Sequence, residues 1–182
     1  HKKEYENAIE DYKKALAIKP QSHEILEKVA DSYFCMSDFE RAVVFYECSL
    51  NKKFVNTWSL LGLSKTYELT KRFPKAIEYM EKAFDSNPED GNISYNLVLL
   101  YMESNDYEKA LSLINKILKE KPDFDRGYYL IGLICEKKDE IGQALDNYEK
   151  AIKINPENLD AHLALGVICL NAEDYENAEI EI

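Results

Sequence analysis

Residues 107–123 read YEKALSLINKILKEKPD, and this stretch decides how the chain folds. The side chains of Ala110, Ile114 and Ile117 recur at intervals of three and four residues, which is the spacing of one face of an α-helix. Pro122 ends this helix, because proline cannot continue a helix and disfavours the helical conformation of the residue before it. The stretch therefore predicts one helix with a defined end.

A second helix is expected immediately before this one. Ile93, Leu97 and Tyr101 have helical spacing, and the polar residues 104–106 separate them from the stretch that follows. The unit 91–124 is thus predicted to be a helix, a tight turn and a second helix. The corresponding turns carry short polar side chains that can cap the next helix. These turns are Ser37–Asp38, Asn105–Asp106, Lys138–Asp139 and Glu173–Asp174.

This unit recurs along the whole chain with a period of 34 residues. Alanine marks each period, at Ala8, Ala42, Ala76, Ala110, Ala144 and Ala178. Most periods close with a proline, at Pro20, Pro88, Pro122 and Pro156, and Phe54 takes that place once. A fixed period of this length indicates a repeat array, in which each helix pair packs on its neighbours.

Columns of this period predict the core. The small alanines allow two helices to approach closely, and larger residues fill the space beside them. One column of larger residues reads Tyr12, Tyr46, Met80, Ile114 and Tyr148. An aromatic column reads Tyr5, Phe39, Phe73, Tyr107 and Tyr175. We expect both columns to form the hydrophobic core and not a cofactor site.

Two segments, YLIGLIC at 129–135 and IGQALDNYEKAIKINP at 141–156, resemble the motif of the tetratricopeptide repeat (TPR) family. The resemblance covers the whole chain and implies an all-α fold, a right-handed α-solenoid of antiparallel helix pairs with a 34-residue period. In this register, residues 1–182 form a single array. Its full units are 23–56, 57–90, 91–124 and 125–158, and its partial units are 1–22 and 159–182. Because both ends fall inside a unit, we expect the chain to be a piece of a longer TPR protein.

Charge limits the kinds of partner. The chain of 182 residues has a net charge of −11, and it has no basic stripe that would neutralise the phosphates of a nucleic acid. No apolar run reaches the length that spans a membrane. The acidic excess is greatest in residues 159–182. It indicates either an acidic docking surface or, as we favour, a unit cut before the lysines that balance the earlier units.

No motif predicts catalysis. Gly127 and Gly132 have the spacing of a phosphate-binding loop, but Leu133 follows where a lysine is required. No nucleophile, base and orienting group occur together. The cysteines, which show no metal-ligand spacing, are Cys35, Cys48, Cys135 and Cys169. We therefore expect no enzyme activity, no cofactor and no metal. Free and mostly buried thiols would suit a reducing compartment, so the predicted location is cytoplasmic.

In the TPR family the first helices of successive units line a concave groove, which implies where a partner would bind. On the predicted helix 92–103, Tyr95, Leu99 and Met102 lie opposite the side that faces the second helix. Applying this register to every unit gives the predicted partner-binding residues Trp58, Leu61, Lys65, Tyr95, Leu99, Met102, Arg126, Tyr129, Leu133, Leu163 and Val167. The unit 23–56 adds the acidic residues Glu24, Glu27 and Asp31, so the groove changes from acidic to apolar.

These residues favour a scaffold or adaptor that holds a peptide or helical segment of another protein through apolar and aromatic anchors. Tyr95 and Tyr129 have two interpretations of equal weight, because they can also pack neighbouring first helices together. Leu99, Leu133 and Val167 occupy a column where the family commonly has asparagine, and we interpret them as partner contacts. Two alternatives stay open. The chain is a self-associating or obligate structural subunit, or it is the regulatory arm of an enzyme whose catalytic domain lies elsewhere.

Overall fold

The computed structural model describes residues 2–50 and 56–171, and all regular structure within these residues is α-helical. The helices are α1 (Lys2–Ile18), α2 (His23–Cys35), α3 (Phe39–Ser49), α4 (Thr57–Leu69), α5 (Phe73–Ser86), α6 (Gly91–Glu103), α7 (Tyr107–Glu120), α8 (Asp125–Lys137), α9 (Ile141–Ile154) and α10 (Leu159–Asn171). The expected all-α fold is therefore confirmed.

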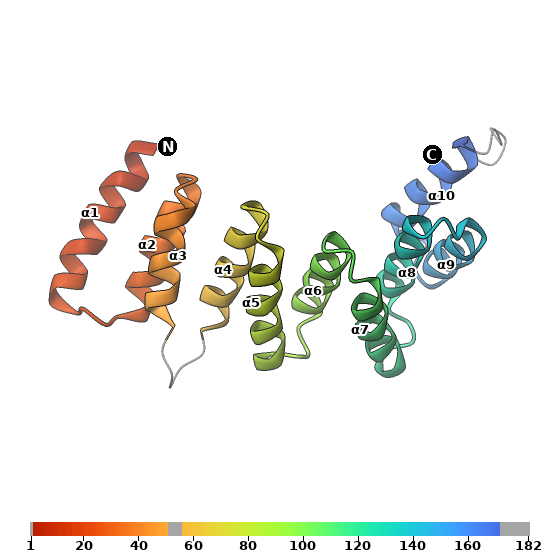
Figure 1. Cartoon of the computed structure of the whole chain (residues 1–182), viewed down its shortest axis with the longest axis horizontal. Helices are drawn as coiled ribbons and strands as arrows, with labels where there is room; N and C mark the ends of the chain where they lie inside the picture. The colour runs from red at the N-terminus through yellow and green to blue at the C-terminus, as the bar shows by residue number, and fades with distance from the viewer. Residues whose placement is uncertain (1, 51–55, 172–182) are drawn as a thin grey trace. The chain divides into compact units, whose positions relative to one another are not determined.

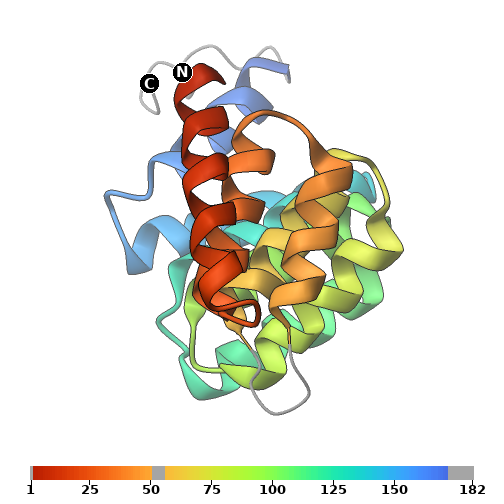
Figure 2. The same ribbon diagram turned by 90° about the vertical axis from the view of Figure 1, so that its left-hand side faces the viewer.

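The helices form two compact units, which we describe separately. Unit 1 comprises residues 1–104 with α1 to α6, and unit 2 comprises residues 105–182 with α7 to α10. In each unit every helix packs on the next one in the sequence (Figure 1). In unit 1, α2 also contacts α4, so two first helices of successive repeats meet. In the view along this unit, α1 in red is the helix nearest the viewer (Figure 2).

The alanine column and the column of larger residues lie in the core, as expected. The aromatic column does not: Tyr5, Phe39, Phe73 and Tyr107 are only half-buried, and the last three are the first residues of α3, α5 and α7, beside the turns. The side chains of Ala42, Ala76, Ala110 and Ala144 are fully buried. Beside them, Tyr46, Met80, Ile114 and Tyr148 are also buried. The residue facing each large side chain is small where the large one is a tyrosine. A Cβ atom at Gly62 would come within 3.0 Å of the Tyr46 ring, and one at Gly132 would come equally close to the Tyr148 ring.

The turns inside the helix pairs repeat one backbone feature. Ser37, Lys71, Asn105 and Asp139 all have positive φ, and they lie 34 residues apart. The next residue is the N-cap of the following helix. At two of these caps, Asp38 accepts a hydrogen bond from the backbone N–H of Arg41, and Asp106 accepts one from that of Lys109. The short side chain before a helix thus fixes where that helix begins.

One expected cap is wrong. Asp139 is the left-handed residue of its turn, and the N-cap of α9 is Glu140, whose side chain makes no capping bond. The reason is that residues 137–140 are all polar, so the composition does not distinguish the cap from the residue before it. The expected cap at 173–174 lies outside the described residues.

The prediction that the thiols are mostly buried is also wrong. Cys35 and Cys48 are exposed, Cys169 is half-buried, and only Cys135 of the four is buried. Cys35 is the last residue of α2, and Cys48 faces solvent near the end of α3. Burial raises the pKa of the Cys135 thiol. All four cysteines are free.

Candidate binding groove

The first part of the candidate site is a hollow of about 630 Å³ between α2 and α4, which we call the α2–α4 hollow. It is lined by Glu27, Lys28, Asp31, Phe34, Cys35, Tyr46, Trp58, Leu61, Gly62 and Lys65. Trp58, Leu61 and Lys65 come from one face of α4, since they are three and four residues apart. The Trp58 side chain is 73% exposed, although it is the largest apolar side chain in this hollow.

The floor of the α2–α4 hollow is built by Tyr46 of α3. Its ring is buried against the backbone of Gly62, which has no side chain to displace it. Its hydroxyl donates a hydrogen bond of 2.8 Å to Oδ1 of Asp31. Burial, followed by this bond, raises the pKa of Tyr46, so the hydroxyl stays protonated and remains a donor. One oxygen of the Asp31 carboxylate is therefore held from inside the protein.

The charged side chains of the α2–α4 hollow are paired with one another. Lys28 Nζ lies 3.3 Å from Oδ2 of Asp31 and 3.7 Å from Oε1 of Glu27. Asn56, the N-cap of α4, donates its side-chain N–H to Oε2 of Glu27. Lys65 Nζ lies 2.8 Å from Oε1 of Glu68. The two acids of α2 thus already accept a cation, whereas the charge of Lys65 is balanced on its own helix.

The second part is a hollow of about 300 Å³ with α4 on one side and α6 on the other, the α4–α6 hollow. Its lining comprises Leu61, Lys65, Glu68, Met80, Asn96, Leu99, Leu100 and Glu103. Leu61 and Lys65 line both hollows. The two hollows therefore share one wall, and together they make a groove along the first helices of unit 1, which we call the unit-1 groove.

Unit 2 presents a different surface. Tyr129 and Leu133 of α8 are half-buried and pack against the core cluster of Cys135, Ala144, Tyr148 and Ile168. The centroid of the Tyr129 ring lies 5.9 Å from that of the Tyr148 ring. The Tyr148 hydroxyl in turn donates a hydrogen bond to Glu136. The Tyr129 ring is thereby used for packing inside unit 2.

The exposed apolar side chains of unit 2 lie mainly on α10. Leu163 and Val167 are 48% and 51% exposed, and Leu159 and Leu170 are exposed on the same helix. Their spacing of three and four residues places all four on one face. We call Leu159, Leu163, Val167 and Leu170 the α10 stripe. Arg126, another predicted contact, is exposed on α8.

The structure brings together four of the predicted contact residues. Trp58, Leu61, Lys65 and Leu99 all line the unit-1 groove. Tyr95 and Met102 are half-buried on α6 but line neither hollow. The other predicted contacts lie in unit 2. They are Arg126, Tyr129 and Leu133 on α8, and Leu163 and Val167 on α10.

The hydroxyl of Tyr46 has a role that the periodicity does not predict. Tyr46 was expected only as a core residue, yet its hydroxyl contacts a carboxylate that lines the groove. The signal that could have found this bond was the combination of a tyrosine in the core column with an acid on the groove face of the same unit.

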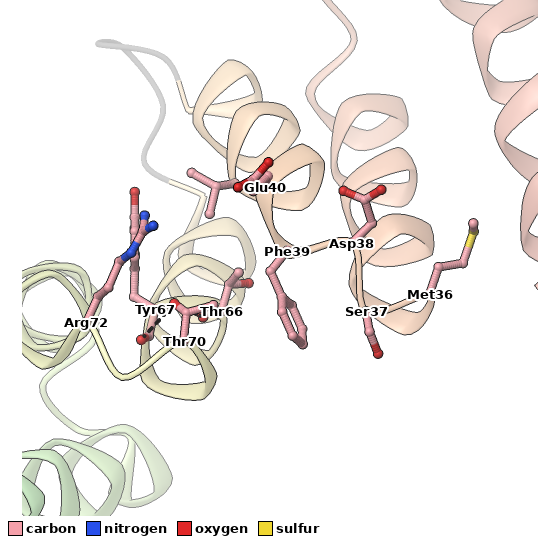
Figure 3. A pocket seen from close by; sticks show the side chains of 10 residues that line it. Met36, Ser37, Asp38, Phe39, Glu40, Thr66, Tyr67, Thr70 and Arg72 are labelled. Carbon is pink, nitrogen blue, oxygen red and sulfur yellow. Dashed lines mark hydrogen bonds between the residues drawn. The ribbon is translucent and has the colours of Figure 1, made fainter.

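A further hollow of about 710 Å³ lies in unit 1 beside the turns. Figure 3 shows Phe39 between the Met36–Asp38 turn and the side chains of Thr66 and Thr70, with Arg72 beside Tyr67. Periodicity gives no signal for this hollow, because the turn residues differ from unit to unit. Asp38 pairs with Arg41 and not with a side chain across the hollow.

The described residues offer little for metal or membrane binding. Among residues 2–50 and 56–171, no three histidine, cysteine or acidic side chains are close enough together to hold a metal ion. Within the same ranges, no helix has both the length and the apolar character needed to cross a membrane.

Sequence profiles described as tetratricopeptide repeat match residues 1–22, 69–134, 126–158 and 147–180. No curated protein sequence matches the chain.

Several solved structures have the same fold. A crystal structure of MamA is 24% identical to this chain with a TM-score of 0.72, and the match covers 86% of this chain and 85% of that one. MamA from Desulfovibrio magneticus RS-1 is 17% identical with a TM-score of 0.67, covering 87% and 90% of the two chains. YrrB, described as a TPR protein with an unusual peptide-binding site, is 19% identical with a TM-score of 0.65, covering 93% and 88%.

Proposed function

Since this chain belongs to the tetratricopeptide repeat family, we propose that it is an interaction scaffold that holds a segment of a partner protein in the unit-1 groove. Proteins with this helical repeat fold are typically non-catalytic scaffolds for other proteins. Stacked repeats suit such a role because they present an extended surface and contact only their neighbours. YrrB, which shares the fold, is described as having a peptide-binding site.

The observation that carries the proposal is the position of Trp58 beside Leu61. Trp58 is 73% exposed, and Leu61 forms the wall shared by the two hollows. Tryptophan is the residue type most enriched among those that dominate binding energy at protein interfaces. A partner segment that covers Trp58 would bury apolar area that the isolated chain leaves in water. Leu99 extends the same apolar wall into the α4–α6 hollow.

We propose the remaining predicted contacts as additional partner-binding residues. Tyr95 and Met102 on α6, Arg126, Tyr129 and Leu133 on α8, and Leu163 and Val167 on α10 stay predicted partner contacts. A single array with the unit boundaries given above, an adaptor role and a cytoplasmic location also stay predictions. The free thiols support the last of these.

The test is a selection of random twelve-residue peptides displayed on phage against the wild-type chain. It is run in parallel against the variants Trp58→Ala and Leu61→Asp. The control is Val44→Asp, which places the same charge on an exposed apolar position of α3 that lines neither hollow. We expect the wild type and the control to enrich the same apolar or aromatic motif and the two groove variants to lose it.

Circular dichroism shows whether each variant keeps its helices. Peptides that bind the folded groove variants as tightly as the wild type would contradict the proposal. The failure of the wild type to enrich any peptide would contradict it as well.

A second function, self-association, is favoured by the α10 stripe. A single apolar face on one helix can be self-complementary, as the two-fold interface of a dimer requires. Sedimentation of the wild type and of Leu163→Asp with Val167→Asp over a wide concentration range tests this function. We expect a concentration-dependent dimer that the double variant abolishes, and a wild type that stays monomeric would exclude it.

A further inference from the structure

Asp31 differs from an ordinary surface carboxylate, because its two oxygens have separate partners. Oδ1 accepts the hydrogen bond from the buried Tyr46 hydroxyl at 2.8 Å. Oδ2 lies 3.3 Å from Nζ of Lys28, and both side chains line the α2–α4 hollow. The buried tyrosine thus fixes one oxygen of the carboxylate, and the other is paired with a lysine whose side chain is exposed.

We propose that the α2–α4 hollow binds the guanidinium group of an arginine in the partner segment, an inference that rests on the proposed function. Asp31 supplies the negative charge, and the exposed ring of Trp58 supplies an aromatic face in the same hollow. Arginine is the side chain that suits both, because its planar guanidinium stacks on aromatic rings and pairs with carboxylates. Glu27 adds a second acid to the lining.

The position of Lys28 indicates that a cation can be accommodated beside Asp31 and Glu27. Its ammonium group lies between Asp31 and Glu27, so the chain itself already puts a positive charge there. The Lys28 side chain is 55% exposed, and exposed ion pairs of this kind contribute little to stability. An arginine from a partner can therefore replace Lys28 at small cost, and Lys28 acts as a weak competitor for the site.

Tyr46 is a positioning residue in this proposal. Its ring is buried and lies against the backbone of Gly62 on α4. Unit 2 contains a similar arrangement, in which the buried Tyr148 packs against Gly132 and donates to Glu136. The two tyrosines occupy the same place in the period, three repeats apart. The packing partners differ, however, because Gly62 belongs to the first helix of the next repeat and Gly132 to the first helix of the same repeat.

The experiment uses the most enriched peptide from the selection above, labelled with fluorescein, and measures its affinity by fluorescence anisotropy. We expect this peptide to contain an arginine next to an apolar residue. Replacing that arginine with citrulline, which has the same shape without the charge, is expected to weaken binding about tenfold or more, as for a lost charge-assisted pair. Lysine in its place should recover only part of the affinity.

Variants of the chain test whether Asp31 causes this difference in affinity. Asp31→Asn should weaken the arginine peptide to the level of the citrulline peptide, so that the protein no longer distinguishes the two. Tyr46→Phe should reduce that discrimination while the helices stay intact, which a purely structural role would not do. Lys28→Met should strengthen binding, because it removes the competing cation. The controls are Asp85→Asn, an exposed acid at the end of α5, and Tyr79→Phe, which removes a hydroxyl bonded to Glu47.

Three outcomes would overturn the inference. In the first, the arginine and citrulline peptides bind the wild type equally. In the second, Asp31→Asn keeps the discrimination between them. Either of these leaves the proposed function standing, because the peptide still binds in the groove. In the third, the wild type enriches no peptide, and this outcome removes the proposed function together with the inference.

Discussion

Tyr46 in unit 1 and Tyr148 in unit 2 occupy the same place in the period, but their surroundings differ. Each tyrosine is buried, packs against a glycine and donates to an acid, Asp31 or Glu136. In unit 1 the nearby aromatic residue is Trp58, which is largely exposed. In unit 2 it is Tyr129, which packs on the core. Trp58 and Tyr129 are not at the same repeat position, and the aromatic ring beside the tyrosine is exposed to solvent in unit 1 but packed on the core in unit 2.

The largest difference in stability between the two units is expected when Trp58 or Tyr129 is replaced with alanine. Tyr129→Ala removes a half-buried ring from the core of unit 2 and should lower the free energy of unfolding by about 2 kcal/mol. Trp58→Ala removes an exposed ring and should change it by less than about 0.5 kcal/mol. Urea denaturation followed by circular dichroism measures both. Equal losses of stability for the two variants would show that the two rings contribute equally to the fold, which contradicts the expected difference.

Alanine at Gly62 and at Gly132 tests how freely each neighbouring tyrosine ring can move in its unit. Gly132→Ala should destabilise unit 2 by about 1–3 kcal/mol, because the new Cβ overlaps the fully buried Tyr148 ring. Gly62→Ala should cost less, since Tyr46 adjoins the open α2–α4 hollow.

The control for these two variants is Gly142→Ala. A Cβ at this position of α9 meets nothing within 4 Å, so the variant should stabilise the chain by roughly 0.5 kcal/mol through its higher helix propensity. Midpoints of urea unfolding give the order of the three variants. A stabilising Gly132→Ala would show that the ring is free to move.

Helix caps give a smaller effect within unit 2. Asp106→Ala removes the bond to the backbone N–H of Lys109 and should cost about 1 kcal/mol. Glu140→Ser adds a capping side chain to α9, which lacks one, and should gain up to about 1 kcal/mol. Thermal unfolding of the two variants measures the opposite signs. A loss of stability in Glu140→Ser would mean that the Glu140 side chain has another role.

The smallest expected effect is the pH dependence of the stability that the Asp38–Arg41 pair contributes in unit 1. The hydrogen bond from the Arg41 side chain lowers the pKa of Asp38 in the folded chain. A lowered folded pKa stabilises the fold at pH values above the unfolded pKa of about 4, and this contribution is lost as the pH falls through the folded pKa. Asp38→Asn keeps the capping oxygen without the charge. We expect the variant to lose slightly less stability than the wild type between pH 5 and pH 3, measured by urea denaturation.

Much of the fold could be predicted from the sequence, because the period repeats the same packing problem. The alanines at 42, 76, 110 and 144 are buried as expected, and α7 ends at Glu120, just before Pro122, as expected. The N-cap at Glu140 could not be predicted, since neighbouring polar residues are equally able to cap. The exposure of Cys35 was missed because the period does not show that it ends its helix.

The candidate site was predicted only in part. Helical spacing places Trp58, Leu61 and Lys65 on one face, and the structure shows all three lining one hollow. The different roles of Trp58 and Tyr129 could not be predicted, because spacing gives the direction of a side chain and not how far its neighbours cover it. The Tyr46–Asp31 hydrogen bond depends on the reach of a ring across two helices, which periodicity does not encode.

The most direct test of the unit-1 groove as the binding site is the fluorescence of Trp58, the single tryptophan of the chain, during titration with the enriched peptide. Because Trp58 is largely exposed in the free chain, burial under a bound segment should shift its emission to shorter wavelength. The shift should saturate at the same concentration as the anisotropy of the labelled peptide. An anisotropy change with no change in tryptophan emission would show that the peptide binds elsewhere, and would contradict the unit-1 groove as the binding site.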